Sequence, residues 1–199
     1  MIKSLRILTV AAAMAAFSGA AYAAPVTVGP GGFDGGYATS ITYDDAAARG
    51  TANDRDNALN ALGAADGNFF EIGFGSFVDL TFGAVFDNSV VKVFEITFNN
   101  VAAFPESVDL YVGSGGSFTF VDSISNLAAQ TGATAITGAG VFDTVRLMDT
   151  STPLFGATTG GFDIDSVKVT PIPLPAGIAL LGTGLAFAGF MSRRRRNQA

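Results

Sequence analysis

The strongest constraint on the fold is a run of apolar residues at every second position. Val78, Leu80 and Phe82 are apolar, and the residues between them, Asp79 and Thr81, are polar. Side chains alternate between the two faces of a β-strand, so this period predicts a strand with one buried face. The same alternation recurs along the chain between glycine-containing turns, which favours strands over helices.

Eight short strands are expected from this pattern: Ile41–Tyr43, Phe69–Phe74, Phe77–Phe82, Val90–Phe98, Ser107–Val112, Phe118–Val121, Val141–Met148 and Phe162–Val169. Turn clusters separate them at Asp66-Gly67, Asp87-Asn88 and 113–116. Many short strands with little helix are typical of an antiparallel two-sheet sandwich of the jelly-roll kind, so the predicted fold class is all-β. One short helix is expected over Asp56–Leu62 with an Asp or Asn cap, and the glycine-rich stretch Val28–Tyr37 is expected as a flexible lead-in rather than a strand.

The first 23 residues have the organisation of a signal peptide. Lys3 and Arg6 precede the apolar stretch Ile7–Phe17, and Ala21 and Ala23 form the small-x-small pattern that signal peptidase accepts. An apolar run of eleven residues would span only about 16 Å as a helix, about half of a bilayer core, so a permanent anchor is the weaker alternative. Residues 1–23 are therefore expected to be removed after export, which leaves 24–170 as one sandwich domain.

The last segment, residues 171–199, combines a stiff motif, an apolar run and a cationic end. The apolar run Gly177–Met191 is predicted to enter the inner membrane as a single helix. Four arginines follow it and are expected to stay in the cytoplasm by the positive-inside rule: Arg193, Arg194, Arg195 and Arg196. A plain tail anchor without processing remains the alternative.

The motif before the apolar run is Pro173, Leu174, Pro175 and Ala176. It resembles the PEP-CTERM class of bacterial sorting signals, in its variant with the consensus Val-Pro-Leu-Pro-Ala, although Ile172 stands where Val is usual. The resemblance implies processing by an exosortase, a transient membrane-anchored precursor, and delivery to the cell surface or extracellular matrix of a Gram-negative bacterium, often one that makes exopolysaccharide and biofilm. The two prolines keep this segment extended and open to a protease.

Composition excludes several functions for the part between the two ends. This part holds five of the eleven basic residues and all seventeen acidic ones, which gives a formal charge of −12 and argues against nucleic acid as a partner. The chain has neither Cys nor His, so thiol nucleophiles, Ser-His-Asp triads and imidazole zinc sites are excluded. No enzyme activity is expected.

A polysaccharide-active hydrolase is the alternative that uses carboxylates alone, because glycosidases need only a pair of them. The chain has three glutamates, Glu71, Glu95 and Glu106. Apolar neighbours make Glu95 the strongest candidate for a raised pKa, and the solvent face of a strand explains it equally well.

Four aspartates are the candidate metal ligands. Strict alternation over Phe162–Val169 would place Asp163 and Asp165 on the face of Val167 and Val169, so a buried carboxylate would need a cation or several donors. Asp54 and Asp56 lie in an acidic loop that could supply further oxygen ligands, which suits a structural Ca²⁺. The alternatives are that Asp163 caps a turn, that Asp165 pairs with Arg55 or Arg146, and that Asp54 caps the helix.

A second resemblance covers about residues 54–169. The order of the segments 60–75, 93–95, 108–112 and 161–167 is similar to secreted bacterial sandwiches of the discoidin and galactose-binding type. That resemblance implies glycan binding through loops at one end and a structural calcium. The predicted function is a secreted, surface-sorted, non-enzymatic protein that binds extracellular polysaccharide. A purely structural, self-associating matrix protein is the alternative.

Overall fold

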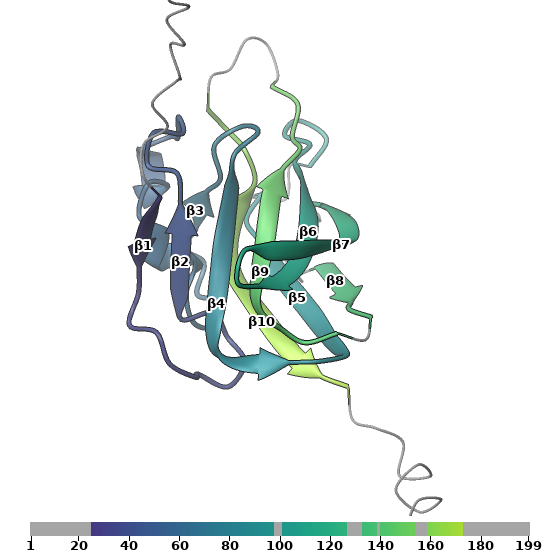
Figure 1. Ribbon diagram of the computed structural model, residues 1–199. Coiled ribbons are helices and arrows are strands. Elements are labelled where there is room, and N and C mark those ends of the chain that lie inside the picture. Colours follow the sequence, from purple (N-terminus) through teal and green to yellow (C-terminus); the bar gives the residue numbers. More distant parts are fainter. Residues whose placement is uncertain (1–24, 98–100, 127–132, 139, 154–158, 173–199) are drawn as a thin grey trace, which may run out of the picture.

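The computed structural model describes residues 25–97, 101–126, 133–138, 140–153 and 159–172, which form two antiparallel sheets packed face to face (Figure 1). The larger sheet has the order β1 (Val26–Val28), β2 (Ser40–Tyr43), β4 (Phe77–Phe86), β9 (Phe142–Asp149), β6 (Ser107–Ser114) and β7 (Ser117–Ser125). The smaller sheet has the order β3 (Phe70–Glu71), β10 (Asp163–Pro171), β5 (Ser89–Glu95) and β8 (Ala133–Ile136). The predicted two-sheet antiparallel sandwich is confirmed.

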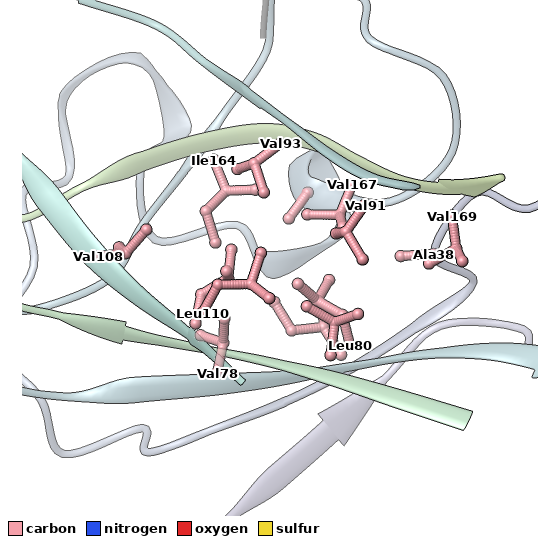
Figure 2. Packing of buried hydrophobic residues seen from close by; sticks show 14 of the residues in the cluster. Ala38, Val78, Leu80, Val91, Val93, Val108, Leu110, Ile164, Val167 and Val169 are labelled. Carbon is pink, nitrogen blue, oxygen red and sulfur yellow. The ribbon is translucent and has the colours of Figure 1, made fainter. Parts of the chain in front are cut away.

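The core lies between the two sheets and is built from the alternating apolar positions. Val78 and Leu80 of β4 face Val91 and Val93 of β5 across the sandwich, and Leu110 of β6 adds to the same layer (Figure 2). All five side chains are almost wholly buried. Burial of each such side chain stabilises the fold by about 1.5–3 kcal/mol, and the domain has no disulfide to add to this stabilisation.

Each of the eight predicted strands is present with altered bounds, and two strands were not predicted. The missed strands are β1 and β8, which have three and four residues. The predicted strand Phe69–Phe74 shrinks to the two residues of β3: the Ile72 amide still donates to the Phe162 carbonyl (2.9 Å), but the chain then turns, and the Gly73 carbonyl accepts from the Ser76 amide (2.9 Å).

The short helix predicted over Asp56–Leu62 is present with the expected Asn cap, but it is a four-residue 3₁₀ helix and not an α-helix. Two short 3₁₀ turns occupy this region, η1 (Ala52–Asp54) and η2 (Ala58–Ala61). Asn57 caps η2, since its side chain accepts a hydrogen bond from the Leu59 amide at 3.2 Å. Three- and four-residue turns gain too few hydrogen bonds to propagate into an α-helix.

The glycine-rich stretch Val28–Tyr37 is not a free lead-in. Val28 ends β1, the Gly31 amide donates to the Thr39 carbonyl at 3.2 Å, and the Thr39 hydroxyl donates to the Gly32 carbonyl at 2.6 Å. The glycines let this loop pack its backbone directly against β4.

The predicted signal peptide, the predicted sorting motif, the apolar run and the four arginines lie outside the described residues. In the part of the chain that the structure describes, no helix is long and apolar enough to cross a membrane.

Candidate functional site

The loops that carry the candidate site meet at one end of the sandwich, here called the loop end. Antiparallel pairing brings together the ends of β5, β7 and β9 and the starts of β6 and β10, since Ser107 pairs with Ser125, and Ile164 with Glu95. In Figure 1, β9 points toward the loop end at the top of the view and β10 runs away from it.

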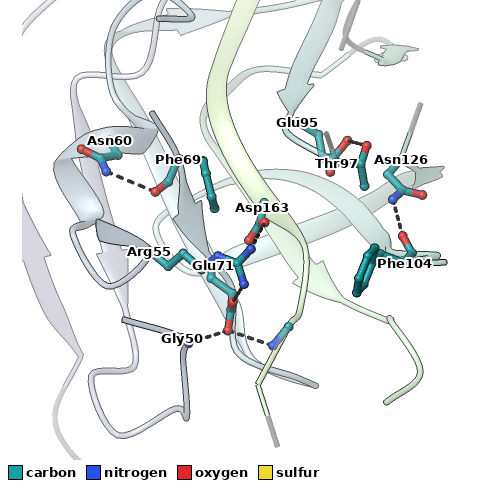
Figure 3. Close-up of polar contacts among 11 residues, drawn as sticks. Gly50, Arg55, Asn60, Phe69, Glu71, Glu95, Thr97, Phe104, Asn126 and Asp163 are labelled. Carbon is teal, nitrogen blue, oxygen red and sulfur yellow. Dashed lines mark hydrogen bonds and ion pairs between the residues drawn. The ribbon is translucent and has the colours of Figure 1, made fainter. Parts of the chain in front are cut away.

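A buried ion-pair network organises the loop end. The Arg55 guanidinium reaches two carboxylates, with Nη1 3.3 Å from Glu71 Oε2 and Nη2 3.7 Å from Asp163 Oδ2 (Figure 3). Glu71 is fully buried and also accepts hydrogen bonds from the amides of Gly50 and Gly160, each at 2.9 Å. Glu71 is therefore paired with a cation and with two backbone donors, as a buried carboxylate requires.

Asp163 is less well compensated than Glu71. The pKa of Asp163 is raised to about 8, chiefly by burial, with Arg55 lowering it and the neighbouring carboxylates Glu71 and Glu95 raising it. Among the described residues, Asp163 Oδ1 has no hydrogen-bond partner. Asp163 therefore carries a proton in most molecules at neutral pH, and the charge of Arg55 is balanced mainly by Glu71.

Asp165 is held by the backbone of a loop. Its two carboxylate oxygens accept hydrogen bonds from the amides of Asp66 (3.0 Å) and Gly67 (3.2 Å). Its pKa is raised, chiefly by burial, and these two bonds oppose the shift. Ile164 and Val167 both belong to the core although they are three positions apart, because β10 contains a β-bulge between Ile164 and Ser166.

The prediction that the two aspartates share the face of Val167 and Val169 is wrong for this reason. A bulge inserts one residue, and every side chain beyond it moves to the opposite face. The aspartates nevertheless become buried, since Asp163 is 3% exposed and Asp165 is 5% exposed.

The four predicted calcium ligands do not form one set. Asp54 and Asp56 are exposed, Asp163 faces Arg55, and Asp165 accepts two backbone hydrogen bonds. Across the described residues there is no group of three or more carboxylates able to hold a metal ion. Since calcium requires ionised oxygen ligands, these aspartates fit a shared ion poorly, and calcium binding stays a prediction.

The predicted alternatives to metal binding at these aspartates can each be compared with the structure. Arg55 pairs with Asp163 rather than with Asp165, and Arg146 makes a bidentate pair with Asp79 at 2.7 and 2.8 Å. The acidic loop and β10 thus do come together, as predicted, but the contact is made by Arg55. Asp54 caps neither η1, whose N-cap is Thr51, nor η2.

A hollow of about 340 Å³ opens beside this network at the loop end. It is lined by Val101, Pro105, Glu106, Ser107, Ser125, Asn126, Thr150 and Thr152. Asn126 fixes one wall, because its Nδ2 donates to the Phe104 carbonyl at 2.7 Å (Figure 3) and its Oδ1 accepts from the Glu106 amide at 3.2 Å. The Ser107 and Thr150 hydroxyls, which also line the hollow, bond to each other at 2.8 Å.

Glu106 is the one ionisable side chain among the residues that line this hollow. The pKa of Glu106 is raised to about 9, chiefly by burial and to a smaller extent by the carboxyl groups of Asp163 and Glu95. Among the described residues, Glu106 Oε2 has no hydrogen-bond partner. At neutral pH the group is therefore a neutral carboxylic acid that can donate as well as accept a hydrogen bond.

Glu95, the glutamate singled out in the sequence, has a different role. It is 5% exposed and accepts a hydrogen bond from the Thr97 hydroxyl at 2.9 Å (Figure 3), so the alternative that places it on a solvent face is wrong. No local pattern marks Glu106 as a site residue, since its neighbours in the hollow, Asn126 and Thr150, lie 20 and 44 positions further along the chain.

No protein-family model matches this chain, and no curated protein matches it. Several solved structures are similar. One is the CBM32 of AlyQ in complex with 4,5-unsaturated mannuronic acid, with 15% identity, a TM-score of 0.49, and coverage of 69% of this chain and 96% of that chain. Another is the family 32 CBM from C. perfringens NanJ in complex with galactose, with 14% identity, a TM-score of 0.44, and coverage of 58% and 85%.

A third similar structure is a Ruminococcus gnavus GH29 fucosidase in complex with fucose. It is 14% identical, with a TM-score of 0.46, and the match covers 69% of this chain but only 26% of the fucosidase. At such identities the likeness concerns the sandwich fold alone and assigns no ligand to this chain.

Proposed function

We propose that the domain binds carbohydrate, without catalysis, in the hollow at the loop end. The observation that carries the proposal is the chemistry of its lining. Glu106 has a carboxyl oxygen without a hydrogen-bond partner among the described residues, and the other described polar side chains of the hollow are the hydroxyls of serine and threonine and the amide of Asn126.

An uncharged, hydrogen-bonding cavity suits a hydroxyl-rich, uncharged ligand. The raised pKa of Glu106 keeps its carboxyl neutral at pH 7, so it can donate to a sugar oxygen and accept from a sugar hydroxyl. A volume of about 340 Å³ falls at the lower end of the range of ligand pockets and would hold a single sugar unit at a time. The formal charge of −12 opposes polyanions, which favours neutral polysaccharides.

Binding without hydrolysis is part of the proposal. Glycosidases use two carboxyl groups on either side of the scissile bond. The residues that line the hollow provide one such group, Glu106. Incubation of the protein with polysaccharide followed by a reducing-sugar assay tests this part, and sugar release above that of a Glu106→Gln control would contradict it.

Export and sorting form the second part of the proposal. The signal peptide and the proline motif support a route through signal peptidase and exosortase to the cell surface, where exopolysaccharide would be the ligand. We also propose that the sandwich is a jelly roll of the galactose-binding type. Intact-mass measurement of the protein recovered from the cell surface tests the route: the expected form begins near Ala24 and lacks Arg193–Arg196, and a full-length C-terminus would contradict it.

A glycan screen of the purified protein identifies the ligand. Galactose, fucose and 4,5-unsaturated mannuronic acid are suitable first probes, alongside the exopolysaccharide of the host. We expect binding of a neutral sugar that weakens in Glu106→Leu, which removes both the donor and the acceptor, and that is largely kept in Glu106→Gln, whose amide also has a donor and an acceptor. Failure of every neutral glycan to bind would remove the proposal.

Self-association is a second candidate function, favoured by β7. This nine-residue strand is at the edge of the larger sheet, most of its residues are exposed, and its sequence contains no Pro, Lys or Arg. Natural proteins usually protect such edges with these residues, so β7 can pair with another strand. Sedimentation velocity over a range of concentrations tests the candidate, and a monomer throughout would contradict it.

A further inference from the structure

Exposed apolar side chains gather at the end of the sandwich opposite the loop end, here called the tail end because β10 finishes there. In the described residues, eight large apolar side chains are exposed. Five of the eight belong to the tail end: Phe33 (63% exposed), Val85 (68%), Phe120 (52%), Ile136 (68%) and Val141 (71%). Isolated exposed apolar residues are ordinary, but a concentration at one end indicates an interaction surface.

Strand pairing places these side chains together. Three of them, Phe120, Ile136 and Val141, line a second hollow of about 370 Å³ beside the β6–β7 hairpin. Val85 stands near the finish of β4, and Phe33 follows Gly32, whose backbone packs against Gly83 of the same strand. The apolar surface therefore extends from the finish of β4 to the β6–β7 hairpin.

The chain leaves the sandwich at this same end. Pro171 pairs with Ser89 at the finish of β10, and the Ile172 amide donates to the Asn88 carbonyl at 3.0 Å. In the sequence, residues 173–176 separate Ile172 from the apolar run that begins at Gly177. Five residue steps reach at most about 18 Å when fully extended, so the tail end must lie close to any bilayer that the run enters.

We propose that the tail end rests on the lipid bilayer in the membrane-anchored form, with its exposed apolar side chains in the headgroup region. Apolar side chains on a tethered surface gain free energy by entering the boundary between headgroups and acyl chains, about 5–10 Å deep. The formal charge of −12 favours a zwitterionic lipid surface over an anionic one.

This contact would orient the proposed binding site. Since the loop end is opposite the tail end, the hollow around Glu106 would face away from the membrane, toward extracellular polymer. The inference rests on insertion of the apolar run Gly177–Met191 and is independent of whether the hollow binds a glycan.

Site-specific quenching tests the proposal on the full chain, which has no natural Cys or Trp, so a single introduced cysteine is a unique label position. The variants Val85→Cys and Val141→Cys report on the tail end. Leu59→Cys and Phe104→Cys are controls away from the tail end, with similarly exposed side chains (53% and 57%). Each is labelled with a polarity-sensitive fluorophore and reconstituted into phosphatidylcholine vesicles that contain a lipid with a quencher near its headgroup.

We expect several-fold stronger quenching and a blue-shifted emission at positions 85 and 141 than at positions 59 and 104. Equal quenching at all four positions would overturn the proposal, as would failure of the chain to float with the vesicles. A blue shift in the absence of lipid would also overturn the proposal. If that shift depended on protein concentration, a second copy of the chain would be the occupant of the tail end. If it did not depend on concentration, the occupant would be the chain's own apolar run. Glycan binding, measured on the same samples, reports separately on the loop end.

Discussion

Arg55 Nη2 and Asp163 Oδ2 lie 3.7 Å apart, and this contact joins the acidic loop before η2 to the first residue of β10. The same guanidinium contacts the fully buried Glu71 at 3.3 Å. A cationic side chain thus occupies the place between loop and strand where the sequence suggested a calcium ion.

Removal of the Arg55 charge should destabilise the domain. In Arg55→Met the buried Glu71 carboxylate loses its cation, and we expect a decrease of about 2–4 kcal/mol in the free energy of unfolding, below the largest buried-pair effects because Arg55 is partly exposed. Asp163→Asn should change stability much less, because Asp163 is already largely neutral at pH 7. Urea unfolding followed by circular dichroism measures both variants, and equal losses would contradict this assignment of the charges.

Stability should fall as the pH rises. Asp163 and Glu106 have pKa values of about 8 and about 9 in the folded protein, against roughly 4 in an unfolded chain. Between about pH 4 and pH 9 the folded state therefore binds more protons than the unfolded state. The stabilisation from these two carboxyl groups is complete below about pH 4 and is lost as the pH rises through about 8–9. Urea unfolding from pH 5 to 9 measures the slope.

The double variant Asp163→Asn/Glu106→Gln is the control for this pH dependence. Neither replacement titrates, so the decline in the free energy of unfolding should flatten. A wild-type protein whose stability increases across the same range would show that the two carboxyl groups are ionised in the fold.

Asp165 provides the test for calcium. Its oxygens accept two backbone hydrogen bonds, and Asp165→Asn keeps only one acceptor, so we expect a loss of about 1–3 kcal/mol. On this account, thermal unfolding shows the same loss in calcium and in chelator. A melting temperature that falls on chelation in wild type, and not in Asp165→Asn, would establish Asp165 as a calcium ligand.

Gly83 should be intolerant of a side chain. Its φ is +62°, and a Cβ there would collide with the backbone of Gly32. Gly115→Ala is a matched control, because Gly115 has nearly the same φ of +59° and open space around it. The control should lose about 1–2 kcal/mol from backbone strain, and Gly83→Ala should lose about 1–3 kcal/mol more. Equal losses in thermal unfolding would show that the loop around Gly32 moves aside freely.

Alternation explains why most of the fold could be predicted from the sequence. Strands such as β4 and β6 have an apolar residue at every second position, and both are in the structure. The strand β8 was missed because Ala133–Ile136 is short and has no apolar alternation, and its place in the sheet comes from pairing with β5. The bulge in β10 was missed because strict alternation allows no inserted residue.

The candidate site was predicted less well because it is non-local. Asp163 and the acidic loop were expected to meet through a metal ion, but the contact is made by Arg55, which the sequence had offered as a partner of Asp165. The hollow joins Glu106, Asn126 and Thr150, which three separate loops and strand ends supply. No spacing rule links such residues before the two sheets are assembled.

Carbohydrate affinity of matched threonine variants tests the central claim most directly. Thr152 lines the hollow at the loop end and Thr119 lines the hollow at the tail end, and both are exposed. Thr→Val removes one hydroxyl and keeps the shape, so Thr152→Val should weaken binding of the glycan found in the screen by about 1 kcal/mol, roughly fivefold, whereas Thr119→Val should bind as wild type does. Isothermal titration calorimetry at pH 7 measures the three affinities. Unchanged binding in Thr152→Val together with weakened binding in Thr119→Val would contradict the placement of the site at the loop end.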